Sequence, residues 1–295
     1  MAYAFVLMIT RILGIPAALV LILLTVTCSG SDATGPGGGG SGGTGFAGQI
    51  DHSCADLNDI PDSWIDSVQV NIRMHYAHTS HGGQLTTGLD LIESDDSAYD
   101  VEIGSSWLPD VTGALCIFDG QEGETYISPD LFWETSDGMN MTRDVLTNNP
   151  TIIVCMWCWC GQMDYYTEDQ VQAYIDSMSV LENEYSGVTF VYMTGNAQST
   201  GSEGYNRYLR NQQVRDFCEN NSKILFDFAD FDAWWYNTST SQWEQNTYSY
   251  SGSEIPLEHE EFNGDEAGHT TFESCRQKGR AVWWMLAMIA GWEGI

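Results

Sequence analysis

Three of the six histidines in this 295-residue chain lie within one short segment around a single serine. The segment HYAHTSHGGQ, residues 75–84, contains His75, His78, Ser80 and His81. A serine hydroxyl becomes a nucleophile when a neighbouring imidazole accepts its proton, and the oxyanion formed on attack needs hydrogen-bond donors. The segment therefore predicts a reactive serine, Ser80, with His78 and His81 lining the substrate side.

The same residue types fit two other roles. Ser80 can cap a helix that we expect to begin near Gln84, because serine is a favoured N-cap residue. Neutral imidazoles are common transition-metal ligands, so His75, His78 and His81 can also bind zinc. The segment leaves a strand and enters Gly-Gly, however, and does not continue as one helix face. We therefore expect no metal and no other cofactor.

The elements around this segment alternate between strand and helix, which is the order that builds a parallel sheet covered on both faces. Unbroken apolar runs predict buried strands, and spaced apolar residues predict helices. The predicted strands are 72–78, 114–118, 151–159, 188–194 and 224–230, and the predicted helices are 60–71, 167–185, 205–220 and 278–290. Residues 99–140 and 234–258 are predicted to form mostly long irregular loops. The expected fold is a single three-layer α/β/α domain of flavodoxin-like type, residues 48–295, with a mainly parallel central sheet.

Polar residues follow each predicted strand, and in an open parallel sheet such residues meet beyond the carboxyl ends of the strands. Ser80 follows the first strand, Gly161 and Gln162 follow the strand 151–159, and Asn196 follows the strand 188–194. His269 precedes the last helix. Backbone N–H groups at Ser80 and Gly161 and the side-chain amide of Asn196 can stabilise an oxyanion. His269 is the predicted base, with His81 as the alternative.

Several motifs resemble those of the SGNH, or GDSL-like, hydrolase superfamily. The segments HTSHGGQL, WCGQ, FVYMTGN, RNQQVRDFC and KGRAVWWMLAMIAGW are similar to a group of exported bacterial proteins assigned to it, over residues 60–292. The resemblance implies Ser80 as nucleophile, Ser80, Gly161 and Asn196 as oxyanion donors, and His269 as base. The usual Gly-Asp-Ser block is His-Thr-Ser here. The carboxylate that orients His269 is either Glu266 or Asp265.

Cysteine and aromatic residues add further candidates. Cys155, Cys158 and Cys160 can bind a metal, but on a strand they point to opposite faces, so core packing with one disulfide is preferred, with Cys275 as the guessed partner. Trp234 and Trp235 lie in an irregular aromatic segment that can form a ligand wall or a packing cluster. Asp227, Asp230 and Asp232 can bind calcium or simply face solvent.

Composition and the N-terminus indicate an exported protein. The 41 acidic and 10 basic residues give a net charge of −31, which disfavours binding to nucleic acid and to anionic lipid. An apolar run ends at Cys28 and is followed by a Gly/Ser-rich stretch. We interpret residues 1–27 as a signal peptide and 28–47 as a flexible tether, with Cys28 as a lipoprotein anchor in preference to a plain secretory signal or an uncleaved membrane anchor.

These observations predict an extracytoplasmic serine hydrolase that cleaves an ester. The resemblance to SGNH hydrolases implies that the acyl group can be carried by a carbohydrate. The alternative is a surface protein that binds a glycan or a partner through its aromatic loops on a non-catalytic hydrolase scaffold. The sequence does not indicate an oligomeric state.

Overall fold

The computed structural model describes residues 47–121 and 123–295. The predicted signal segment, Cys28 and all but the last residue of the predicted tether lie outside these ranges. Among the described residues, no helix combines the length and the apolar character needed to cross a bilayer.

A seven-stranded sheet forms the centre of the domain, and every neighbouring pair in it is parallel. The strand order is β1-β7-β6-β5-β2-β4-β3. The bounds are β1 Gly48–Ile50, β2 Arg73–His78, β3 Val101–Ser105, β4 Leu115–Asp119, β5 Val154–Cys158, β6 Thr189–Met193 and β7 Ile224–Phe226. β2 and β5 lie in the middle and consist almost wholly of buried residues, as expected for parallel strands covered on both faces.

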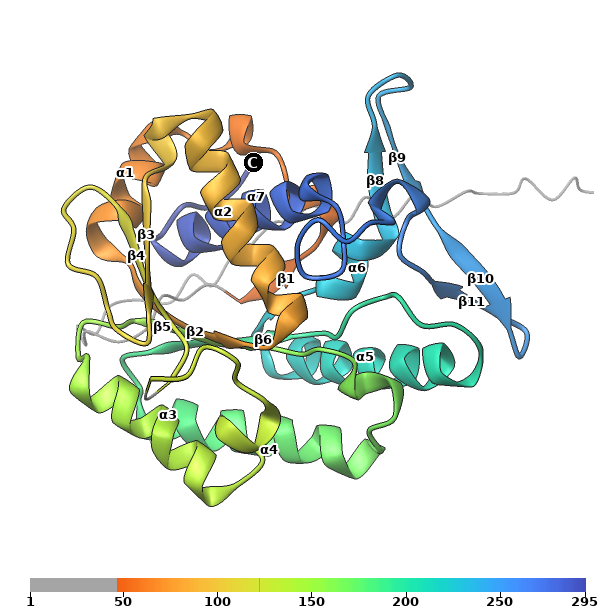
Figure 1. Cartoon of the computed structure of the whole chain (residues 1–295), viewed down its shortest axis with the longest axis horizontal. Helices are drawn as coiled ribbons and strands as arrows, with labels where there is room; N and C mark the ends of the chain where they lie inside the picture. The colour runs from red at the N-terminus through yellow and green to blue at the C-terminus, as the bar shows by residue number, and fades with distance from the viewer. Residues whose placement is uncertain (1–46, 122) are drawn as a thin grey trace, which may run out of the picture.

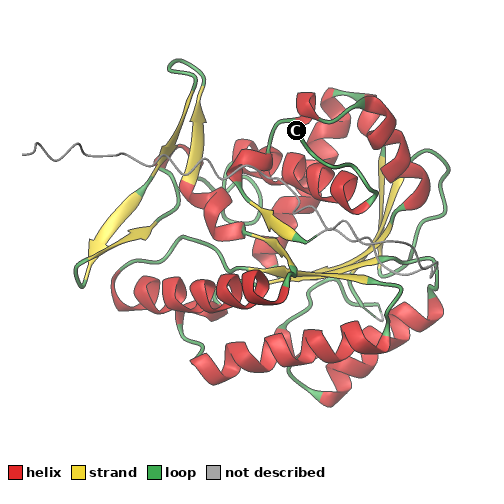
Figure 2. Ribbon diagram, turned by 180° about the vertical axis from the view of Figure 1, so that it is seen from behind, coloured by secondary structure: helices red, strands yellow, loops and turns green. Residues whose placement is uncertain are grey.

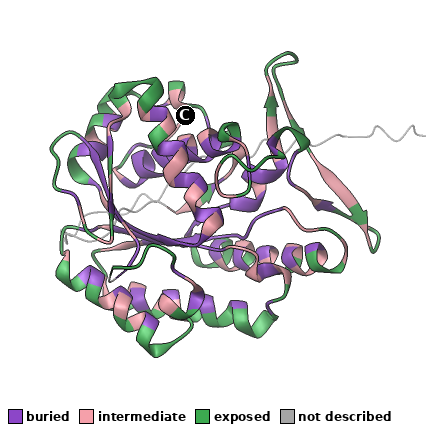
Figure 3. Ribbon diagram, in the orientation of Figure 1, coloured by how far each residue is buried: buried purple, intermediate pink, exposed green. Residues whose placement is uncertain are grey.

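Helices cover both faces of this sheet, which confirms the predicted α/β fold with three layers. Figure 1 shows α1, α2 and α7 on one face and α3, α4 and α5 on the other. The view from behind shows the same two layers, and burial is concentrated along the sheet between them (Figures 2 and 3). The bounds are α1 Asp62–Asn71, α2 Gly83–Asp95, α3 Ser136–Asn148, α4 Glu168–Glu184, α5 Gly201–Asn221, α6 Phe228–Ala233 and α7 Phe272–Ile289.

Several segments differ from the sequence prediction. The predicted strand 114–118 is confirmed as β4, but the region 99–140 also contains β3 and the start of α3, and the region 234–258 forms two antiparallel hairpins rather than irregular loops. These are β8 Trp234–Asn237 with β9 Gln242–Gln245, and β10 Thr247–Tyr250 with β11 Ser253–Pro256, which project from the body (Figure 1). The predicted strand 224–230 ends at Phe226, because Asp227 accepts a hydrogen bond from the Asp230 N–H and caps α6.

The last helix begins six residues earlier than predicted. Thr271 caps α7 by accepting a hydrogen bond from the Ser274 N–H. Residues 281–289 of α7 are apolar and buried, whereas the first turns carry many polar side chains, so the apolar pattern marks only the second half of the helix.

Two glycines allow α7 to approach α2 closely. A Cβ atom at Gly88 of α2 would overlap the carbonyl oxygen of Cys275, and one at Gly279 of α7 would lie 2.6 Å from the Gly88 carbonyl carbon. Real side chains do not reach such distances, so the two backbones must touch. This contact fixes the position of α2, which begins directly after Ser80, His81 and Gly82.

Lys278 of α7 forms a fully buried ion pair beneath the carboxyl edge of the sheet. Its Nζ atom lies 2.7 Å from Asp232 Oδ1 and 2.6 Å from Ser274 Oγ, and the Lys278 and Asp232 side chains have no exposed surface. The only other lysine, Lys223, pairs with Glu182 at 2.6 Å in a partly exposed position. The chain therefore offers an internal comparison between a buried and a surface pair.

We expect Lys278→Met to lower the free energy of unfolding by about 3–5 kcal/mol, because it leaves the Asp232 carboxylate buried without a counter-charge. The matched control, Lys223→Met, should cost about 1 kcal/mol or less, since a partly exposed pair gains little. Urea unfolding followed by circular dichroism measures both. Equal losses in the two variants would contradict this assignment.

Candidate active site

The register between β2 and β5 brings the two main candidates together. His78 is paired with Cys158 at the ends of these strands. Ser80 and Cys160 each follow two residues later, so both leave the sheet at the same edge. β6 is the next strand beyond β5, and its continuation brings in the loop that carries Asn196 and Gln198. The chain order reverses across β2 and β5, which is where open parallel sheets place their ligands.

A thiol and an imidazole form the centre of this site. Cys160 Sγ lies 3.0 Å from His81 Nδ1 and 3.3 Å from Ser80 Oγ. The other ring nitrogen, His81 Nε2, lies 2.9 Å from Gln198 Oε1. An amide oxygen only accepts, so His81 Nε2 carries the proton in that contact and Nδ1 faces the sulfur. Cys160, His81 and Gln198 thus contact one another in a row, as candidate nucleophile, base and orienting group. This is the arrangement found in cysteine-dependent acyl-transfer sites.

Electrostatics favour the ionised form of this pair. Partial burial opposes ionisation of Cys160, but hydrogen bonding and charge from His81, with a hydrogen bond from Ser80, lower the pKa of Cys160 to about 6. Burial also opposes charging of His81, but the hydrogen bond to Cys160 and the thiolate charge raise the pKa of His81. Both shifts favour the thiolate–imidazolium form of the pair over the neutral form.

The backbone supports the same charge state. Ser80–Gly82 forms a 3-10 turn that runs into α2, so the thiolate lies at the N-terminal end of a 13-residue helix. Such an end carries a partial positive charge that stabilises an anion. The predicted capping role of Ser80 is wrong, because Gly82 is the N-cap residue of α2 and no side chain caps it. The Ser80 hydroxyl contacts the sulfur instead.

His269 lies beside this pair without contacting Ser80. Its ring centroid is 5.0 Å from that of His81, its side chain is 53% exposed, and its φ of +70° lies in the left-handed region. No hydrogen bond joins His269 to Ser80 among the described residues. Asp265 Oδ1 is 3.7 Å from His269 Nδ1, whereas Glu266 accepts a hydrogen bond from the Phe272 N–H at the start of α7. Of the two candidate acids, the structure places Asp265 near the ring.

The predicted oxyanion donors surround the sulfur in different ways. Asn196 Nδ2 donates to the Cys160 carbonyl oxygen at 2.9 Å, so this amide holds the Cys160 loop. Gln162 Oε1 accepts a hydrogen bond from the Cys160 N–H at 2.7 Å. Gly161 lies between them in the chain, directly after the thiol. Gly161 thus follows Cys160 directly in the chain and Ser80 meets its sulfur in space, while Asn196 and Gln162 hold the Cys160 backbone.

The three clustered histidines have separate partners. His75 is fully buried, with Nε2 3.0 Å from the Gly120 carbonyl oxygen, and burial lowers its pKa to about 4. His78 is buried against Asp119, with Nε2 3.0 Å from Oδ1. Of the three, only His81 reaches the thiol, and the role of His78 at the substrate stays a prediction.

The guessed disulfide between the cysteine cluster and Cys275 is wrong. Cys155, Cys158, Cys160 and Cys275 are free thiols, as are Cys116 and Cys218. Burial raises the pKa of Cys155, Cys158, Cys218 and Cys275 above the ordinary thiol value. Cys160 alone among these six is not fully buried, which separates one reactive thiol from five core residues.

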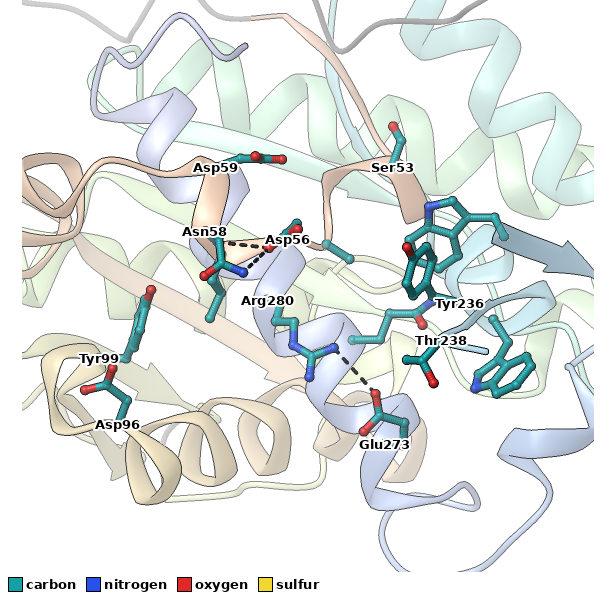
Figure 4. A pocket seen from close by; sticks show the side chains of 15 residues that line it. Ser53, Asp56, Asn58, Asp59, Asp96, Tyr99, Tyr236, Thr238, Glu273 and Arg280 are labelled. Atoms are coloured by element: carbon teal, nitrogen blue, oxygen red, sulfur yellow. Dashed lines mark hydrogen bonds and ion pairs between the residues drawn. The ribbon is translucent and has the colours of Figure 1, made fainter. Parts of the chain in front are cut away.

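The aromatic segment forms part of a second cavity, of about 650 Å³, that Ser80, His81 and Cys160 do not line. Figure 4 shows Tyr236 on one side of it and Asp56, Asp59 and Arg280 on the other. Trp235 also lines this cavity, whereas Trp234 stacks on His52 with ring centroids 4.3 Å apart. Trp234 is therefore a packing residue and Trp235 a candidate ligand contact.

The three acidic residues considered for calcium have different partners. Asp227 accepts two hydrogen bonds from Arg215, Asp230 lies 2.6 Å from His52 Nδ1, and Asp232 pairs with Lys278. They do not converge on one point. Asp51, His52 and Asp230 do lie close together, but His52 and Asp230 already satisfy each other.

Sequence reasoning missed the roles of Cys160 and Gln198. WCGQ places Cys160 directly at the carboxyl end of a central strand, and the same argument that selected Gly161 and Gln162 could have selected it. Gln198 carries no comparable signal, because a single glutamine in a loop fits any polar role.

Comparison with known proteins does not supply a family: neither the protein-family models nor the curated proteins contain a match to this chain. The resemblance to SGNH hydrolases therefore stays a prediction from the motifs.

Among the six free thiols in residues 47–121 and 123–295, we expect iodoacetamide to modify Cys160 alone, with a rate that rises through a midpoint near pH 6. The reactive form is the thiolate, which His81 stabilises, so the rate should be nearly maximal at pH 7. Intact-mass spectrometry of the folded protein after timed labelling measures the profile. His81→Ala should move the midpoint toward the ordinary thiol value of about 8.5.

Cys160→Ala is the control for site selectivity and should remove the adduct with the midpoint near pH 6. A midpoint above pH 8 for the Cys160 adduct in the unmodified protein would show that Cys160 and His81 do not form an ion pair.

Proposed function

We propose that this protein is an extracytoplasmic acyl hydrolase that cleaves an ester through a thioester intermediate on Cys160. The observation that carries the proposal is the 3.0 Å contact between Cys160 Sγ and His81 Nδ1, with Gln198 on the far side of the ring. Ser80, the nucleophile expected from the motifs, becomes a hydrogen-bond donor to the thiolate. Export rests on the N-terminal sequence pattern.

Acylation begins with the thiolate. Cys160 Sγ attacks the ester carbonyl carbon, and the carbonyl oxygen becomes an oxyanion stabilised by backbone N–H groups, for which Ser80 and Gly161 are the candidates. As the tetrahedral intermediate collapses, the C–O bond breaks and His81 Nδ1–H gives its proton to the leaving alcohol. The products of this step are an alcohol, a thioester and a neutral His81.

Deacylation reverses the proton transfer. Neutral His81 accepts a proton from water through Nδ1, and the resulting hydroxide attacks the thioester carbon. The C–S bond breaks, the carboxylic acid leaves, and the thiolate–imidazolium pair forms again. Gln198 keeps the Nε2 proton in place throughout, which reserves Nδ1 for both transfers. His269 lies beside His81 with its side chain 53% exposed, so it can contact an approaching substrate.

Hydrolysis of a chromogenic short-chain ester tests this proposal. The wild type should show a burst of alcohol release and a mass increase of one acyl group on Cys160. Cys160→Ala and His81→Ala should each lower kcat/KM by at least about 100-fold, because they remove the nucleophile or the proton donor. Ser80→Ala and His269→Ala should lower kcat/KM by less, since neither side chain takes part in forming or breaking a bond.

The serine mechanism gives the opposite pattern. Loss of activity in Ser80→Ala and His269→Ala, with a fluorophosphonate adduct on Ser80 and full activity in Cys160→Ala, would replace the thiol by the serine. An inactive but folded and alkylatable wild type would count against acyl hydrolysis as a whole.

Non-catalytic binding of a glycan is the second candidate, favoured by the separate aromatic cavity. Trp235, Tyr236 and Trp243 lie along it together with carboxylate, amide and hydroxyl groups that can bind sugar hydroxyls. We expect Trp235→Ala to weaken binding of an oligosaccharide by about tenfold or more, as measured by calorimetry. Cys160→Ala should leave that affinity unchanged. Absence of binding to a panel of neutral and charged oligosaccharides would eliminate this candidate.

A further inference from the structure

Gln198 and Glu258 continue the hydrogen bonds of the Cys160–His81 pair on the side of His81 that faces away from the sulfur. The Gln198 amide oxygen lies 2.9 Å from His81 Nε2, and its nitrogen donates to Glu258 Oε1 at 3.1 Å and to the His269 carbonyl oxygen at 2.8 Å. A carbonyl oxygen and an ionised carboxylate only accept hydrogen bonds, so both require the amide nitrogen on their side and the amide oxygen toward His81. This orientation favours the tautomer in which Nε2 carries a proton and Nδ1 faces the sulfur. Of the two acceptors, only Glu258 can change its charge.

The surroundings of Glu258 make its charge variable. Glu258 is buried, and its Oε1 also accepts a hydrogen bond from Thr270 Oγ1 at 3.0 Å. The charged groups that face it are Asp232 of α6 and Lys278 of α7. Two buried carboxylates thus share one ammonium, which already pairs with Asp232 at 2.7 Å. One negative charge is left without a full partner, so this region holds a carboxyl group that gains a proton easily.

The neighbouring histidine does not supply the missing charge. His259 Nδ1 accepts a hydrogen bond from the Glu261 N–H, and its ring stacks on Trp235 with centroids 5.3 Å apart. Burial, followed by the charge of Asp232, raises the pKa of Glu258 to about 7, while hydrogen bonds from Gln198 and Thr270 and the charge of Lys278 act in the opposite direction. Glu258 is therefore neutral below about pH 7 and ionised above it.

We propose that Glu258 is a positioning residue for this site, which holds His81 in its protonated form through Gln198. The inference rests on the proposed function in taking Cys160 and His81 as the reacting pair. The sign follows from charge, because a carboxylate behind the Gln198 amide stabilises a proton on His81 and a neutral carboxyl group does not. The Glu258 carboxylate forms as the pH rises through about 7. Glu258 thus extends the thiolate–imidazolium state toward alkaline pH.

Titration of the histidine Cε1–H signals by NMR tests this without any substrate. The His81 signal is assigned by its loss in His81→Gln. We expect Glu258→Gln, which keeps the size and removes the charge, to weaken proton binding at His81 by about three- to tenfold, or half to one pKa unit. Glu258→Asp retains the charge and should shift His81 by less than half as much. The matched control Glu182→Gln removes a carboxylate that pairs with Lys223 and should not shift it.

The wild type supplies a second measurement that does not depend on a variant folding. The His81 signal should show a step at the pH where the ¹³C carboxyl signal of Glu258 titrates, near 7. An unchanged His81 pKa in folded Glu258→Gln, or no such step in the wild type, would overturn the inference. Because neither readout involves turnover, an inactive enzyme that shows both effects would count against ester hydrolysis alone. In an active enzyme, Glu258→Gln should move the alkaline limb of the pH profile of kcat/KM to lower pH by the same half to one unit.

Discussion

Parallel pairing of β2 with β5, in the register that sets His78 opposite Cys158, determines where chemistry can occur in this protein. Both strands are buried on both faces, so neither can shift along the other without exposing apolar side chains. A shift by one residue would separate Ser80 and His81 from Cys160. The geometry of the reactive pair is therefore a consequence of core packing, and the polar contacts refine a position that the sheet has already fixed.

Buried charge connects this edge of the sheet to the helices above it. Asp232 Oδ2 accepts a hydrogen bond from the Ala197 N–H, and its other oxygen binds Lys278. Ala197 lies between Asn196, which holds the Cys160 carbonyl, and Gln198, which orients His81. A buried ion pair costs desolvation and is weak support for stability by itself. Here it also secures the loop that organises the site, so its removal would affect both the fold and the reactive pair.

The sequence was sufficient for the fold class and for the edge of the sheet that carries the site, because long β-branched and aromatic runs have few alternatives to a buried parallel strand. It did not indicate the contact between Cys160 and His81. A cysteine in the run CMWCWC looks like core, and all five other free thiols of the described residues are buried. Only the pairing of β2 with β5 reveals that Cys160 leaves the core where His81 arrives. The hairpins 234–256 were missed because their strands are short and only half-buried, so their residues do not alternate clearly.

The contact between Gly88 and Gly279 gives the two halves of the reactive pair different supports. Cys160 follows a strand of the central sheet, whereas Ser80 and His81 lie at the tip of α2, whose position is set by backbone contact with α7. The distance between the Cys160 sulfur and the His81 ring therefore depends on how far α2 and α7 lie from the sheet. Because the α2 and α7 backbones touch without side chains between them, the two helices cannot repack at another spacing by changing rotamers. The distance within the Cys160–His81 pair is thus set by a backbone contact that includes neither residue.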